Sequence, residues 1–255
     1  MSEEEASKMR AAEAELRDEL LFKQPESTHK GDCPICMIPL PIDPTKSTVT
    51  SCCSKVICMG CCHANWIREA EMRLQHTCPF CREAANIIAE EADKMRLKRI
   101  EANDPVAMRH EGGEQYNRGE YRSAFEYLTK AAELGDAEAH YMLSIVYSDG
   151  LGVEKDEGKE THHLEEAAIG GHPYARYKLG AYEWMNNRNA ERAVKHWTIS
   201  ATQGEGASIK KLLEAFKQEL ISKEDLAVAF RAYKAALAAT KSPQRKVAEP
   251  FYRDL

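Results

Sequence analysis

The cysteines of this chain are confined to one short stretch, and they constrain its folding more than any other feature. All nine lie between positions 33 and 81 of the 255-residue sequence. Eight of them form four pairs, leaving Cys62 over: Cys33 with Cys36, Cys52 with Cys53, Cys58 with Cys61, and Cys78 with Cys81. Structural zinc takes four Cys or His ligands, so eight thiols are enough for two Zn²⁺ ions per chain. Because thiolate is the ligand form, we expect folding of this stretch to depend on metal uptake.

Three features favour zinc over disulfide bonds or redox chemistry. The first twenty residues are acidic and lack the apolar segment of a secretory signal, so we expect a cytoplasmic protein, with a nuclear location left open. Thiols stay reduced in those compartments. A thioredoxin-like motif needs one Cys-x-x-C beside a βαβ pattern, whereas three such pairs are crowded together here.

The cysteine spacing resembles that of a RING finger with all-Cys ligands. In that family the first and third pairs hold one zinc ion, and the second and fourth pairs hold the other. The resemblance implies one site made of Cys33, Cys36, Cys58 and Cys61 and a second made of Cys52, Cys53, Cys78 and Cys81.

The same resemblance implies a surface for an E2 ubiquitin-conjugating enzyme. Ile35 lies between the first two ligands, where RING ligases carry an apolar E2 contact. Trp66 falls in the expected helix over 65–74, and Pro79 follows the seventh ligand. Arg82 directly follows the eighth ligand, at the position that clamps E2-bound ubiquitin in active RING ligases.

The sequence departs from the RING pattern at its third and fourth ligands, Cys52 and Cys53, which are adjacent. Neighbouring side chains on a strand point to opposite faces, so these two can share one zinc only across a turn. His63 or His76 is the alternative ligand in place of one of them. Cys62 is interpreted as a spare, partly buried thiol, and the alternative role for Trp66 is a place in the core of the small domain.

Composition argues against two classes of partner. The net charge is −6 and the pI is about 5.9, with no basic stripe, which excludes a nucleic-acid binder on charge. No run approaches the roughly 18 apolar residues of a membrane helix, so we expect no membrane partner.

Residues 104–240 contain an internal repeat marked by Gly135, Gly171 and Gly204, which are 36 and 33 residues apart. The same residue types recur around each glycine: a large apolar residue, a small pair, another small residue and a leucine. In chain order they are Leu128, Leu164 and Trp197; Ala131–Ala132, Ala167–Ala168 and Ser200–Ala201; Ala139, Ala175 and Ser208; and Leu143, Leu179 and Leu212. Such residues three or four apart line one helix face, and glycine ends the helix. The pattern predicts helical hairpins that bury their faces by stacking.

This repeat resembles the Sel1-like repeats, which are related to tetratricopeptide repeats. The matching residues are Ala139, Leu143, Tyr147, Gly150, Gly152 and Val153. We count four units. The first begins near Asp104, which precedes Pro105 as a helix start. The last, 208–240, is degenerate and predicted to be a cap, with Ser222 and Asp225 opening its second helix.

The predicted fold is mainly α: a small zinc-stapled RING domain, with a short β-hairpin and a helix, followed by an α-solenoid of helical hairpins. The charged N-terminal helix has a thin apolar stripe, which predicts either a frayed tail or a flank that packs on the RING or pairs two chains. The C-terminal tail is predicted to fray, with Phe251 and Tyr252 able to dock on the last helix. The predicted boundaries are 1–28 for the N-terminal helix and linker, 29–83 for the RING, 84–103 for a linker helix, 104–240 for the Sel1-like solenoid and 241–255 for the tail.

The combined resemblance implies a RING-type E3 ubiquitin-protein ligase with no covalent catalytic residue. It would bind an E2 and ubiquitin through the zinc finger and a protein substrate or partner on the concave surface of the repeats. The alternative is a zinc-binding adaptor or scaffold without catalytic activity. The pair His162–His163 is interpreted as a solvated or packing position on a helix rather than as a metal site, and Glu165–Glu166 as a polar helix face rather than a catalytic acid pair.

Overall fold

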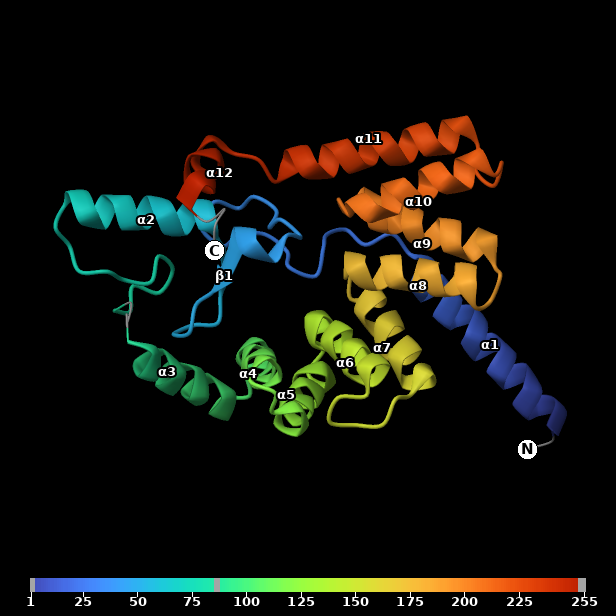
Figure 1. The fold of residues 1–255 in the computed structure, drawn as a ribbon, viewed down its shortest axis with the longest axis horizontal. Helices are drawn as coiled ribbons and strands as arrows, with labels where there is room; N and C mark the ends of the chain where they lie inside the picture. The colour runs from blue at the N-terminus through green and yellow to red at the C-terminus, as the bar shows by residue number, and fades with distance from the viewer. Residues whose placement is uncertain (1–2, 85–87, 252–255) are drawn as a thin grey trace.

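The structure is a computed structural model that describes residues 3–84 and 88–251 (Figure 1). Its first half contains α1 (Glu3–Phe22), the 3₁₀ turn η1 (Pro44–Lys46), β1 (Ser47–Val49), β2 (Val56–Cys58) and α2 (Met59–Glu71). Its second half contains α3 (Ala89–Glu101), α4 (Pro105–Asn117), α5 (Tyr121–Glu133), α6 (Ala137–Asp149), α7 (Glu157–Ile169), α8 (Pro173–Met185), α9 (Ala190–Thr202), α10 (Gly206–Lys217), α11 (Lys223–Ala239), α12 (Pro243–Ala248) and the 3₁₀ turn η2 (Glu249–Phe251). The predicted fold class is confirmed: one short antiparallel hairpin and its helix precede a helical-hairpin solenoid.

Helices α4 to α9 form three successive hairpins, in which α4 packs on α5, α6 on α7 and α8 on α9. Each hairpin ends at a glycine with a left-handed φ, where an L side chain would be strained. These are Gly135 (85°), Gly171 (83°) and Gly204 (95°). The residue after each glycine caps the next helix through its side chain: Asp136, His172 and Glu205. A two-residue signal therefore turns the chain at the end of every unit.

The predicted core positions of the repeats are buried. The leucines Leu143, Leu179 and Leu212 are at most 3% exposed, as are their partners Leu128, Leu164 and Trp197. The small residues let neighbouring helices approach closely. At Gly180 a Cβ would lie 2.5 Å from the indole nitrogen of Trp197, so α8 and α9 pack at a distance that only glycine permits.

The N-terminal helix packs on the repeats. The expectations that it frays, or that it packs on the cysteine-rich part, are therefore both wrong. Its last turns lie against α7 and α9 (Figure 1). Leu21 is 1% exposed in a cluster with α7 and α8. Arg17 donates to Glu165 at 2.7 Å and to Glu166 at 3.1 Å. The acidic pair of α7, expected to be a polar helix face, thus anchors α1.

The C-terminal tail is also ordered through residue 251, so the expectation that it frays is wrong for the described part. Helix α12 packs on α2 of the cysteine-rich part rather than on the last helix of the solenoid. The Phe251 ring lies 4.2 Å from the ring of His63. Tyr252, the other predicted docking residue, lies outside the described residues.

Helix α3 joins the cysteine-rich part to the repeats. It begins at Ala89, later than the predicted start at 84, and Ile87 lies outside the described residues. A buried ion pair between Arg96 and Glu111, with 2.7 Å between Nε and Oε2, fastens α3 to α4. Helix α4 starts as predicted, because the Asp104 carboxylate accepts from the backbone N–H groups of Val106 and Ala107.

The repeats form an arc, and the cysteine-rich part lies between its two ends, with α3 on one side and α12 on the other (Figure 1). Over the ranges that the structure describes, no helix has the length and apolar character needed to cross a bilayer.

Candidate metal centre

Two groups of four cysteines converge in the stretch from Asp32 to Ala84, which we call the cysteine module. One group is Cys33, Cys36, Cys58 and Cys61, here cluster 1; the other is Cys52, Cys53, Cys78 and Cys81, here cluster 2. Within each group the sulfur atoms all lie within 4.8 Å of one another. The structure therefore brings together the two quartets that the sequence resemblance implied, the first pair with the third and the second with the fourth.

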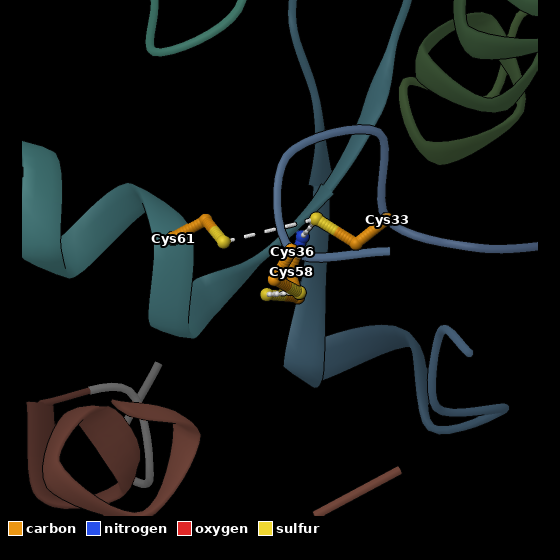
Figure 2. Close-up of side chains that lie close together, drawn as sticks. All are labelled: Cys33, Cys36, Cys58 and Cys61. Carbon is orange, nitrogen blue, oxygen red and sulfur yellow. Dashed lines mark hydrogen bonds between the residues drawn. The ribbon is translucent and has the colours of Figure 1, made fainter. Parts of the chain in front are cut away.

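Cluster 1 is assembled from a loop, a strand end and a helix start (Figure 2). Cys33 and Cys36 lie on a tight turn, Cys58 ends β2, and Cys61 lies in the first turn of α2. The sulfur of Cys33 is 3.9 Å from that of Cys61, and the sulfur of Cys36 is 3.8 Å from that of Cys58. Four sulfurs at about 2.3 Å from a tetrahedral zinc ion are about 3.8 Å apart. The sulfur–sulfur distances in cluster 1 therefore match those of a zinc ion bound by four thiolates.

Each cluster contains one Cys-x-x-C turn of the same backbone design, Cys33–Cys36 in cluster 1 and Cys78–Cys81 in cluster 2. Cys33 N–H donates to the carbonyl of Ile38 and Cys78 N–H to that of Glu83. The residue after the second cysteine has a left-handed φ in both, 55° at Met37 and 65° at Arg82. Isolated antiparallel bridges close both turns, Asp32 with Pro39 and Thr77 with Ala84. The two turns therefore match although neither has glycine at the left-handed position.

In cluster 2 the side chains of the adjacent Cys52 and Cys53 point toward the same candidate metal position, because the chain turns there. Ser54 donates its N–H to the carbonyl of Thr50 at 2.8 Å and has a φ of 54°. This turn brings the Cys52 sulfur to 3.3 Å from that of Cys81 and the Cys53 sulfur to 4.0 Å from that of Cys78. The turn that the adjacent pair requires is present.

In cluster 1, burial, hydrogen bonds and neighbouring thiols shift the pKa values of Cys33 and Cys61 in opposite directions. Burial raises the pKa of Cys33, but N–H donors from Cys58, Cys36 and Ile35 outweigh it and bring that pKa to about 7. Burial and the neighbouring sulfurs raise the pKa of Cys61. Four sulfurs in this space can all ionise only when a positive charge offsets their repulsion. The donor set therefore suits a thiophilic divalent ion.

Neither histidine proposed as an alternative ligand belongs to a described cluster. His63 lies against Phe251, and His76 Nδ1 lies 3.2 Å from the Glu69 carboxylate. Cys62 is half-buried, and burial together with nearby Cys58 raises its pKa to about 12, as suits an unreactive thiol.

Glu69 is a structural centre of the module that sequence reasoning missed. It is 2% exposed and accepts hydrogen bonds from Asn65 and from the backbone and hydroxyl of Thr77. Burial raises its pKa, but these donors and His76 outweigh burial and lower it to about 2. Glu69 thereby ties α2 to the turn that carries Cys78. A lone acid on an amphipathic helix offers no sequence signal for this role.

The four proposed E2 and ubiquitin contacts lie at or near the module surface. Ile35 is 40% exposed on the first turn, and Trp66 is 48% exposed on α2, so Trp66 is not a core residue. Pro79 is half-buried on the second turn. Arg82 is exposed and donates to the side-chain oxygen of Asn65 at 3.2 Å, which places its guanidinium beside α2.

The inner side of the repeats carries a segment of this chain. Residues 21–31, from the end of α1 to the start of the module, run along α6, α8 and α9 (Figure 1). Arg176 of α8 donates to the carbonyls of Leu21 and Lys23, and His29 N–H donates to the carbonyl of Gly171. Part of the surface expected to receive a partner is therefore already covered.

A third group of candidate ligands, His29, Glu138 and His172, lies under this segment. The His172 Nδ1 accepts the N–H of Ala175 at 3.2 Å, which leaves its proton on Nε2, facing Glu138 at 3.5 Å. His29 Nε2 lies 2.7 Å from the same carboxylate, and the two imidazoles stack at 4.2 Å. This arrangement is a hydrogen-bonded clamp rather than an open donor set.

Comparison with known families identifies the repeats. The Sel1 repeat family model matches residues 106–136, 137–172 and 173–205, so the chain contains three Sel1 repeats. No RING family model matches the cysteine module. The fourth unit that we counted lies beyond the matched residues. Its residues fall on α10 and α11, and Ser222 caps α11 as predicted by accepting the N–H of Asp225.

The chain is also similar to curated proteins and to a solved structure. The chain is 28% identical over 168 residues to Protein SHC1 of Saccharomyces cerevisiae, covering 58% of this chain and 33% of that protein. It is 38% identical over 65 residues to the Chitin synthase regulator SKT5 of the same yeast, covering 26% of this chain and 9% of that protein. The chain thus spans at most a third of these relatives. A Sel1 repeat protein from Oxalobacter formigenes superposes with a TM-score of 0.51 at 18% identity, covering 76% of this chain and 86% of that chain, which shows a shared fold.

Proposed function

We propose, from three Sel1 repeats joined to two four-cysteine clusters, that this chain is a RING-type E3 ubiquitin-protein ligase. The observation that carries the proposal is the pairing of the clusters: two interleaved quartets of sulfur with spacings that fit tetrahedral zinc. The Sel1 repeats are suited to protein–protein interaction and would hold the substrate or partner. Because this function requires reduced thiols, the protein would work in the cytoplasm or the nucleus.

Zinc would have a structural role only. With four protein sulfurs at each cluster, no coordination position is left for a water or a substrate. When bound, each ion would lock the two chain segments that meet at its cluster. Cys33, Cys36, Cys58 and Cys61 would hold one ion, and Cys52, Cys53, Cys78 and Cys81 the other.

The residues of the module would then act by positioning. Ile35 and Pro79, on the two matching turns, offer apolar surface to an E2, and Trp66 adds an exposed aromatic ring from α2. Arg82 is an always-charged donor that is fixed beside α2 by Asn65, and would hydrogen-bond to E2-bound ubiquitin. Holding a thioester and an attacking amine together can lower the barrier by several kcal/mol, up to about 7–11 kcal/mol in well-oriented cases.

A second candidate is a zinc-stapled scaffold without ligase activity. It is favoured by the likeness of 65 residues of this chain to a protein described as a chitin synthase regulator, and by the absence of a RING family match. In that case the module would be an interaction surface, and the same residues would contact a different partner.

A ubiquitination assay separates the two candidates. The full chain is incubated with E1, ATP, ubiquitin and a panel of E2 enzymes, and its zinc content is measured in parallel. A ligase forms ubiquitin chains with at least one E2, and Ile35→Ala and Arg82→Ala each reduce chain formation while two zinc ions stay bound. Matched controls are Leu134→Ala and Arg231→Ala, which truncate exposed side chains on the repeats. Inactivity across the panel with two zinc ions bound would contradict the ligase and favour the scaffold.

A further inference from the structure

The C-terminal helix α12 places one arginine against cluster 1. The Arg245 Nη2 lies 3.5 Å from the sulfur of Cys36 and donates to the carbonyl of Ile38 at 2.9 Å. Its Nη1 donates to the carbonyls of Pro39 at 2.7 Å and Thr240 at 2.8 Å. The residue is 7% exposed. Its guanidinium therefore fits between the first cysteine turn and the end of α11.

The module is shaped to receive this helix. A Cβ on Gly60 would lie 2.8 Å from the Arg245 Cγ and 2.9 Å from its Cα, so only glycine at this position lets α12 sit against the start of α2. Gln244 adds a hydrogen bond from Nε2 to the carbonyl of Gly60 at 3.2 Å. Gly60 directly precedes the ligand Cys61, so the docking contact and the cluster share one helical turn.

A zinc ion bound at cluster 1 would carry a net negative charge that a cationic side chain such as that of Arg245 can offset. Four thiolates around one Zn²⁺ leave a net charge of −2, and Cys33, Cys58 and Cys61 are at most 3% exposed. A buried charge is costly unless it is paired or hydrogen-bonded. An arginine beside the cluster offsets that charge, and both of its Nη atoms are hydrogen-bonded to carbonyls or sulfur. Cluster 2 differs, because Cys81 is exposed and water can solvate it.

We propose that Arg245 is an outer-sphere partner of the metal at cluster 1, and that docking of α12 therefore controls how tightly this cluster retains zinc. The proposal rests on the proposed zinc binding by the module. Outer-sphere hydrogen bonds fix ligand orientation, and losing one typically costs 10–100-fold in metal affinity. The end of the Sel1 solenoid would thereby be coupled to the integrity of the proposed E2 surface, since Ile35 lies between two ligands of the same cluster.

The test measures zinc retention at each cluster in the full-length, zinc-loaded chain. A chelator competes for the metal, and cysteines that become free are alkylated and located by mass spectrometry. In Arg245→Gln we expect zinc to leave cluster 1 about 10–100-fold more readily, while cluster 2 behaves as in the wild type. Arg231→Gln, at an exposed position of α11, is the matched control and should change neither cluster.

Two further measurements distinguish a bond to sulfur from simple loss of docking. In the cobalt-substituted protein, Arg245→Gln should shift the sulfur-to-cobalt charge-transfer bands to lower energy, because the sulfur loses a hydrogen-bond donor. Arg245→Lys retains the charge and should recover part of the zinc retention; it also serves as the test if Arg245→Gln does not fold. Equal release from both clusters, or wild-type release from cluster 1, would overturn the proposal. A wild-type chain that binds no zinc would instead overturn the proposed function.

Discussion

The carboxylate of Glu138 lies 2.7 Å from the Nε2 of His29, although 109 positions separate the two residues. Glu138 belongs to the first turn of α6, whereas His29 belongs to the segment that leads into the cysteine module. His172, at the start of α8, faces the same carboxylate from the next repeat. The link between module and repeats is therefore an anchored part of the fold, and its anchor contains titratable groups.

Acidification should weaken this anchor. Burial lowers the pKa of His172 to about 4, from an ordinary 6.5. Between those values the unfolded chain binds a proton that the folded chain does not, so the free energy of unfolding falls as the pH drops. The loss should reach about 2 kcal/mol by pH 5 from this residue. Burial raises the pKa of Glu138, but hydrogen bonds from His172 and His29 outweigh it and hold that pKa well below its usual value, so its contribution is lost in the same direction.

Urea denaturation at pH 7.5 and pH 5 checks this expectation by comparing the wild type with His172→Asn. Asparagine retains an acceptor for the cap at Ala175 but does not titrate, so the variant should lose less stability between the two pH values. The exposed His162→Asn is the control and should follow the wild type. The same pH dependence in His172→Asn as in the wild type would contradict the assignment. Thiol protonation at the module affects all three proteins alike.

Docking of α1 should contribute measurably to stability. Leu21 is 1% exposed among residues of α7 and α8, and its truncation to alanine leaves a cavity. We expect Leu21→Ala to lower the free energy of unfolding by about 2–5 kcal/mol. Leu16 lies on the same helix but is 58% exposed, so Leu16→Ala should change the free energy of unfolding by less than about 0.5 kcal/mol. Similar values for the two variants in chemical denaturation would mean that α1 is not docked in solution.

The contact between α8 and α9 should tolerate no side chain at Gly180. A Cβ there would meet the Trp197 indole at 2.5–3.0 Å, so Gly180→Ala should destabilise the chain by about 1–3 kcal/mol. At Gly113 the nearest atom is the flexible end of Met142 at 3.4 Å. Gly113→Ala should therefore be neutral or stabilise by up to about 1 kcal/mol, since alanine favours a helix. Thermal denaturation of both variants checks the contrast, which fails if Gly180→Ala melts at or above the wild-type temperature.

Metal removal should unfold the module and spare the repeats. Leu40 and Ile57 are the fully buried aliphatic residues of its core cluster, which is too little apolar surface for a unit of this size without metal. After chelation, hydrogen exchange should become fast over residues 32–84 and stay slow in α4 to α9. Unchanged protection of the module with its thiols shown to be free would contradict zinc stapling.

The sequence predicted most of the repeat architecture because the information is local. A glycine with a left-handed φ followed by a capping side chain ends one hairpin and starts the next, and both residues are adjacent in sequence. Burial of Leu143 and its counterparts follows from helical spacing alone. The division of the cysteines into two quartets was implied by the resemblance to RING fingers, and the structure brings the same two groups together.

The placement of the two termini could not be predicted in this way. The apolar stripe of α1 indicated that it docks or frays, but Met9, Leu16 and Leu20 remain about half exposed, and only Leu21 reaches a core. The docking surface is set by ion pairs such as that of Arg17 with Glu165, whose partners are 148 residues apart. No local pattern marks two distant surface charges as partners.

What the sequence alone determined is therefore the set of units: hairpins that end at glycines, and cysteine pairs spaced for a shared ion. Only the tertiary structure decided how those units meet, with residues 21–31 across the inner side of the repeats and Arg245 against cluster 1. The physical reason is that turns, caps and helical periodicity are properties of neighbouring residues. Contacts between remote segments depend on the shape and charge of surfaces that exist only after those segments have folded.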